Sequence, residues 1–148
     1  MADYTQVQKQ LRTDMLADTT LTALLGDTKS IYLKNPSGIF SKPFLIMRFS
    51  NMGPQTQISG VGVYRSLLAW GLYVLNPWQA GPIFSHLEKN WSIPITKPEG
   101  VASTNYRIDN LVWNEIVEIP GVLELTSDGG PVHEFSISSN IRITALTG

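Results

Sequence analysis

The segment VYRSLLAWGLYVLN, residues 63–76, predicts a strand that is apolar on both faces. Side chains alternate between the two faces of a strand. One face would therefore carry Leu67, Ala69, Tyr73 and Leu75, and the other Leu68, Trp70, Leu72 and Val74. The segment FLIMRFS, residues 44–50, repeats this pattern, and Arg48 interrupts the apolar run. Strands of this kind need cover on both sides of their sheet.

Two segments with apolar residues at helical spacing flank these strands in the sequence. The stripes are Tyr4, Val7, Leu11 and Met15 near the N-terminus, and Ile83, Phe84, Leu87 and Trp91 in the middle of the chain. Asp3 is a helix-start signal for the first stripe, and Pro82 fits the first turn of the second helix. Between them LADTTLTALLG, residues 16–26, predicts a short helix that starts at Asp18 and stops at Gly26. Isolated helices below about 12 residues are marginal in water, so this one must dock on something larger.

The C-terminal third predicts two long strands, at about residues 106–125 and 132–146. Asp128-Gly129-Gly130 is the turn signal between them, and Pro120-Gly121 predicts a kink in the first. A further short strand is expected at residues 30–33. This order indicates an α+β fold: a mainly antiparallel (mixed) sheet with an N-terminal helix and one central helix packed on it. The 148 residues fit one domain, residues 1–148.

The predicted helices are too few to cover both faces of strands 44–49 and 63–75. The helix at residues 82–91 can cover one face, and the short helix can close an edge of the sheet. The other face is expected to be sealed by a neighbouring subunit, or by the sheet curling onto itself.

Charge is unevenly distributed along the chain, although the formal net charge is only -1. No acidic residue occurs from Thr28 to Leu87, where the basic residues are Lys29, Lys34, Lys42, Arg48 and Arg65. Residues 99–134 are acidic, with Arg107 as their only basic side chain. The basic residues are too sparse for a nucleic-acid-binding surface. Opposite charges on separate segments suit head-to-tail association, or they neutralise each other within one subunit.

The residue types and their spacing predict no catalytic or metal site. Cysteine is absent, which excludes thiol catalysis and thiolate ligands. Neither His86 nor His133 has a second histidine at metal-ligand spacing, and a partnership of His133 with Asp109 has no support in the sequence. Glu115 and Glu118 lie three apart on a strand, so they point to opposite faces and do not form an acid/base pair. We therefore expect no enzyme and no cofactor.

The N-terminus contains no apolar core of a signal peptide, and no segment approaches the roughly 18 apolar residues of a membrane span. Synthesis in the cytoplasm and no membrane partner are expected. Residues 51–62, NMGPQTQISGVG, are uncharged and predict a long loop between strands. Trp78 lies in a turn after Pro77, where an exposed aromatic side chain would suit an interface.

The layout resembles the tail completion proteins of long-tailed bacteriophages, also called tail terminator or head-to-tail joining proteins. The resemblance covers about residues 7–91. It consists of an amphipathic helix, D-x-x-L-x-x-L-L-G at residues 18–26, the strand IY, the segment KPFLIMRF, a Gly/Gln-rich loop, the strand LLAWGLYVLN and the helix IFSHLEKNW. The C-terminal hairpin and its kink match no motif of that family.

The resemblance implies a structural virion protein that forms a ring, usually a hexamer, at the head-proximal end of the tail tube. Such a ring ends tube polymerisation and offers a docking surface to the head connector, while DNA only passes through its lumen. Its partners would be copies of itself, the tail tube protein and the head completion protein. The expected interface residues are Gln55, Gln57, Ile58, Trp78, Arg48 and Arg65, and the expected lumen residues are Glu115, Glu118 and Glu124. The alternative is a small adaptor or chaperone for tail or secretion-system assembly that is not part of the final particle.

Overall fold

The central strands of the molecule are β2 (Phe44–Ser50), β3 (Val63–Val74) and β6 (Val132–Ala145), which pair antiparallel in that order. The computed structural model describes residues 5–34, 43–50, 63–123 and 132–146. The register pairs Met47 with Trp70 and Trp70 with Ile137. The predicted alternation along β3 is confirmed, because Leu68, Trp70 and Leu72 are buried while Leu67 and Leu75 on the other face are exposed.

The described part of the chain forms one six-stranded sheet with the order β1-β2-β3-β6-β5-β4. At one edge, β1 (Ile31–Tyr32) runs parallel to β2 and is shorter than the predicted strand. At the other edge, β4 (Val101–Ala102), which the sequence did not predict, pairs with the start of β5 (Tyr106–Leu123). Ile93 also forms a bridge with Leu111 of β5. The predicted α+β class with a mainly antiparallel, mixed sheet is confirmed.

Strand β5 is irregular at the predicted kink and at two further places. Its register with β6 shifts between Ile108 and Asn110, between Trp113 and Glu115, and between Ile119 and Leu123. The last shift contains Pro120 and Gly121, where the missing N–H of proline interrupts a regular ladder. These bulges let an 18-residue strand follow the curvature of the sheet.

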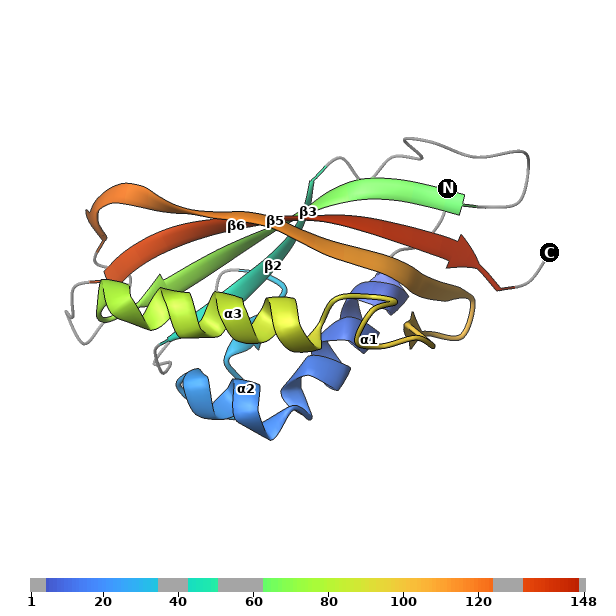
Figure 1. Cartoon of the computed structure of the whole chain (residues 1–148), viewed down its shortest axis with the longest axis horizontal. Coiled ribbons are helices and arrows are strands. Elements are labelled where there is room, and N and C mark those ends of the chain that lie inside the picture. Colours follow the sequence, from blue (N-terminus) through green and yellow to red (C-terminus); the bar gives the residue numbers. More distant parts are fainter. Residues whose placement is uncertain (1–4, 35–42, 51–62, 124–131, 147–148) are drawn as a thin grey trace.

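The described helices all lie on one side of the sheet (Figure 1). They are α1 (Thr5–Leu16), α2 (Thr19–Leu24), the 3-10 turn η1 (Pro77–Gln79) and α3 (Ala80–Asn90). Val7, Leu11 and Met15 are buried as the helical stripe predicts, whereas the expected cap at Asp3 lies outside the described residues. The buried side chains of the helices join those of β2, β3, β5 and β6 in one core.

The short helix α2 contacts α1 and α3, so the expectation that it closes an edge of the sheet is wrong. Its buried Leu21 belongs to the main core instead. The side chain of Arg12 on α1 donates to the backbone oxygen of Ile31, which ties the helical layer to β1. None of the described helices is long and apolar enough to cross a bilayer.

Candidate functional site

The sheet face opposite the helices, called here the open face, carries apolar and charged side chains with little cover. By register it includes Arg48, Arg65, Leu67, Val112, Glu115, Val117, Ile119, Glu134 and Arg142. Leu67 is 50% exposed, Val117 47% and Val112 45%. Exposed apolar side chains on a β-layer are a feature of contact surfaces. The open face is therefore the strongest candidate for an interaction site.

A chain of hydrogen bonds crosses this face from β2 to β6. The guanidinium of Arg48 donates to the hydroxyl of Tyr73 at 3.1 Å, and that hydroxyl donates to the carboxylate of Glu134 at 3.0 Å. Burial raises the pKa of Tyr73 above its ordinary 10.0, the hydrogen bond from Arg48 opposes this rise, and Glu134 adds to it. Tyr73 therefore stays a neutral link between a cation and an anion.

Arg48 lies close over the backbone at Gly71. A Cβ built at Gly71 would come within 2.7 Å of the Arg48 Nη1 atom. The absence of a side chain at this position thus gives Arg48 room to reach Tyr73. The Tyr73 ring also stacks on Phe44, with centroids 4.9 Å apart, so that this corner of the open face holds a small buried aromatic cluster.

A second polar group lies farther along β6. Arg142 donates to Asp109 at 2.7 Å, and the hydroxyl of Thr144 donates to the other oxygen of the same carboxylate at 2.6 Å. The bulge between Ile108 and Asn110 directs the Asp109 carboxylate to this face. Asp109 is thus engaged at the far end of β6 from His133, and the structure does not pair these two residues.

The two histidines have different surroundings. His86 on α3 forms a 2.7 Å contact from its Nε2 atom to the Asp18 carboxylate, and Trp91 Nε1 donates to the same oxygen at 2.9 Å. The other oxygen of Asp18 accepts the backbone N–H groups of Thr20 and Leu21 at 3.1 Å each. Asp18 therefore caps α2 as predicted and also joins α2 to α3.

This shared carboxylate has a perturbed acidity. Partial burial raises the pKa of Asp18, but the hydrogen bonds from His86, Trp91 and the Leu21 backbone, together with the charge of His86, outweigh it. The net result is a pKa below the ordinary 3.8. Asp18 is the anion on which this helix junction depends.

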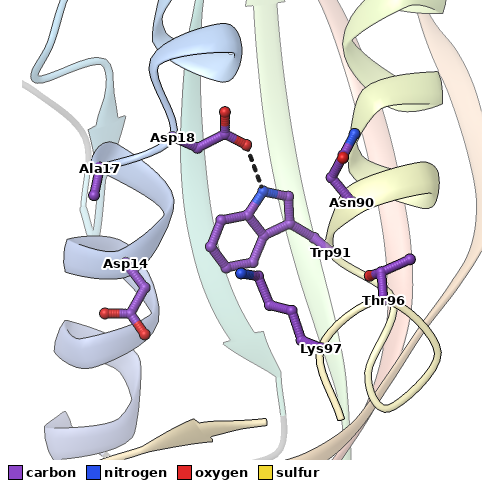
Figure 2. Close-up of a pocket in the computed structure, with 7 residues that line it drawn as sticks. All are labelled: Asp14, Ala17, Asp18, Asn90, Trp91, Thr96 and Lys97. Atoms are coloured by element: carbon purple, nitrogen blue, oxygen red, sulfur yellow. Dashed lines mark hydrogen bonds between the residues drawn. The ribbon is translucent and has the colours of Figure 1, made fainter. Parts of the chain in front are cut away.

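A hollow of about 460 Å³ opens beside the junction (Figure 2). Its lining residues are Asp14, Ala17, Asp18, Asn90, Trp91, Thr96 and Lys97. The Lys97 ammonium lies 4.2 Å from the centre of the Trp91 ring, and Asp14 accepts a hydrogen bond from Gln10 at 2.7 Å. The charged groups of the hollow thus interact with other groups of the same chain.

The structure brings together some of the residues that the sequence selected. Arg48, Arg65 and Glu115 all lie on the open face. Glu118 lies opposite Phe135, on the helical side of the sheet, and Trp78 lies apart in η1 with 73% of its surface exposed. The positions of Gln55, Gln57, Ile58 and Glu124 lie outside the described residues. The interface and lumen assignments stay predictions.

Sequence reasoning missed the partners that organise both polar regions. Tyr73 and Glu134 looked like a core aromatic residue and an alternating polar position, and only the register brings them to Arg48. In residues 5–34, 43–50, 63–123 and 132–146 no group of three or more His, Asp or Glu could hold a metal ion. No protein-family profile matches the chain, and a comparison with curated proteins finds no relative.

Proposed function

We propose that this chain is a structural subunit of a ring, with six copies as the expected number, at the head-proximal end of a phage tail tube. The observation that carries the proposal is the open face, where half-exposed Leu67, Val112 and Val117 share a sheet surface with charges of both signs. A stable lone subunit gains nothing from such a surface, whereas contact with other protein buries it.

The distribution of charge supports assembly from identical subunits. Arg48 and Arg65 come from the basic part of the chain, and Glu115 and Glu134 come from the acidic part. The contacts of Arg48 and Glu134 with Tyr73 favour partial neutralisation within one subunit. Arg65 and Glu115 are exposed, so their charges can contribute to contacts between subunits.

The polar regions support a structural role over an enzymatic one. The Asp18 junction uses its carboxylate to cap α2 and to hold His86 and Trp91, so the strongest histidine contact of the described chain stabilises the fold. A ring that ends tube growth and docks the head connector needs recognition surfaces and no reactive group.

The proposal is tested with the purified full chain and the polymerising tail tube protein encoded in the same genome. Native mass spectrometry and negative-stain electron microscopy should show rings of one defined size, seated at one end of the tubes. Tubes should stop growing when the chain is added in a small molar excess over tube ends. A chain that stays monomeric with tube protein present, and leaves tube length unchanged, contradicts the proposal.

Mass spectrometry of finished particles separates the ring subunit from an assembly adaptor. A ring subunit remains in the particle at a fixed copy number. An adaptor or chaperone acts on the same partners and is absent from the particle.

A further inference from the structure

Strand β5 leaves most of its outer edge unpaired. The short β4 covers only Arg107 and Ile108, and Ile93 covers Leu111. Past Leu111, no described strand pairs with the outer edge of β5, which continues to Leu123. An open row of backbone donors and acceptors is a template for pairing with another chain.

The register shows which groups point outward. Leu111 exchanges two backbone hydrogen bonds with Ile93, at 3.0 and 3.1 Å, so its N–H and C=O point away from β6. In an antiparallel pair, alternate residues share this orientation. Leu111, Trp113, Ile116 and Glu118 face alternate β6 residues, namely Ile141, Ser139, Ile137 and Phe135. The backbone groups of Ile116 and Glu118 therefore point outward. Two residues later, Pro120 supplies no N–H and ends the usable edge.

The opposite edge of the sheet has a matching opening. Strand β1 pairs with Leu45 and Ile46, and no described strand pairs with the outer edge of Met47–Ser50 beyond it. The register runs from Met47 through Trp70 and Ile137 to Ile116, and from Ser50 through Leu67 and Asn140 to Val112. Residues 47–50 at one edge thus lie at the same position along the strand direction as residues 112–116 at the other edge. The intervening strands alternate in direction, so β5 of one copy beside β2 of the next would again be antiparallel.

The two edges carry opposite charge. From Ile108 to Leu123, β5 contains Asp109, Glu115 and Glu118 and no basic residue. The opposite edge carries Lys34 two residues after β1 and Arg48 on β2, with no acidic residue from Thr28 to Leu87. Pairing β5 with β5 of another copy would bring carboxylates together, whereas pairing β5 with β2 brings carboxylates to cations.

We propose that the outer edge of β5 pairs, antiparallel, with residues 47–50 of β2 in a second copy of this chain. This assignment deepens the proposed function and rests on it, because it names the contact that would join the subunits of the ring. The contact is head-to-tail: each copy offers one acidic and one basic edge, so every subunit can bind two neighbours. Residues 47–50 and 112–116 lie at the same position along the strand direction, so neighbouring copies would not be displaced along their strands. This arrangement favours a closed ring over a helical filament.

The test reverses the charge of one edge and then of the other. Sedimentation over a wide concentration range and native mass spectrometry measure association of the full chain alone. The variant E115K/E118K should associate at least about tenfold more weakly than the wild type, because the attraction between Glu115 and Arg48 becomes a repulsion and the acidic edge becomes basic. The control E88K/E99K changes the net charge equally on exposed residues outside β5 and should associate like the wild type.

Mixing supplies the sharper measurement. R48E alone should also weaken association, and an equimolar mixture of R48E with E115K/E118K should recover it, since the reversed edges complement each other. Because R48E also loses the bond to Tyr73, K34E serves as a second variant, and a thermal melt confirms that each variant is folded. Hydrogen exchange should show that the amides of Trp113 and Ile116, which share the outward orientation of Leu111, become protected only in the assembled protein.

Three results would overturn this contact: a wild-type chain that is monomeric at every concentration, edge variants that associate like the control, or an E115K/E118K variant that associates more strongly. Rings that cap tubes but are unaffected by both edge variants would remove this contact and leave the proposed function standing. Rings that are disrupted by the edge variants but do not bind tube protein would support this contact and contradict the proposed function.

Discussion

Leu67 and Leu68 are neighbours on β3, yet they lie on faces with opposite organisation. Leu68 is fully buried beneath the helices, whereas Leu67 is 50% exposed on the open face. On the covered side, the buried Ser139 links two strands: Trp70 Nε1 donates to Ser139 at 3.1 Å, and Ser139 donates to the Leu68 backbone oxygen at 3.1 Å. On the open side, charged side chains extend across the sheet through Tyr73 and Asp109.

The contrast separates what holds the subunit together from what is left for contacts. Free energy from burial is concentrated on one face, where the side chains have lost nearly all contact with water. The other face contributes less to folding and keeps apolar area that a partner can bury. Substitutions on the two faces should therefore have different effects on unfolding and on association.

The largest difference between the two faces is expected in the free energy of unfolding when Leu67 and Leu68 are each replaced by alanine. Leu68→Ala should lower the free energy of unfolding by about 2 to 5 kcal/mol, because it opens a cavity in a closed core. Leu67→Ala should cost less than about 1 kcal/mol, since its side chain is already half in water. Urea denaturation of both variants measures the difference, and equal losses would show that the open face is part of the folding core.

The second effect concerns the helix junction on the covered side. Asp18→Ala removes the cap of α2 and leaves His86 and Trp91 without their acceptor, so it should cost about 2 to 3 kcal/mol. Asp14→Asn is the matched control, because Asp14 has one hydrogen bond within α1 and should cost less than about 0.5 kcal/mol. Guanidinium denaturation followed by circular dichroism compares them, and a small loss for Asp18→Ala would mean that α2 is held by packing alone.

Acid should weaken the same junction. The pKa of Asp18 is lower in the folded chain than the ordinary 3.8, so its contribution is present above that value and is lost as pH falls through the folded pKa. The stability gap between the wild type and Asp18→Asn should therefore narrow as pH falls below about 4. Urea midpoints at each pH measure this gap, and a constant gap would contradict the proposed charge interaction.

The smallest effect is expected on the open face. Tyr73→Phe removes the hydroxyl that links Arg48 to Glu134 while keeping the ring that stacks on Phe44, so it should cost about 1 kcal/mol. Thermal unfolding measures the loss. Gly71→Ala is a companion variant that displaces Arg48 without touching the hydroxyl. If Tyr73→Phe lowered the free energy of unfolding as much as Leu68→Ala, the hydrogen bonds of Tyr73 would contribute as much to folding as packing in the core.

The sequence predicted the parts of the fold that rest on periodicity. Alternation identified β2, β3 and β6, helical spacing identified α1 and α3, and the Asp18 signal placed the start of α2. The sequence could not reveal β4 or the bridge at Ile93, because pairings of one or two residues leave no periodic pattern. The position of α2 was also missed, since its docking depends on side chains of α3 far along the chain.

The candidate site was predictable in part for the same reason. Alternation sent Glu115 and Glu118 to opposite faces of the sheet, as the register confirms. It could not show that all described helices gather on one side, nor that a bulge turns Asp109 toward Arg142. Such features depend on strand order and on local irregularities of the strands, and neither produces a periodic pattern in the sequence.

The Asp18 carboxylate has a consequence for how the chain acquires its shape during synthesis. The backbone groups that it caps lie two and three residues away, but His86 and Trp91 lie 68 and 73 residues downstream. A nascent chain must therefore contain β1, β2 and β3 before the ribosome delivers the partners that anchor α2. The second helix from the N-terminus should thus become permanent only after α3 has formed, and pulse-labelled amides of Thr22 and Leu25 should gain protection together with those of α3.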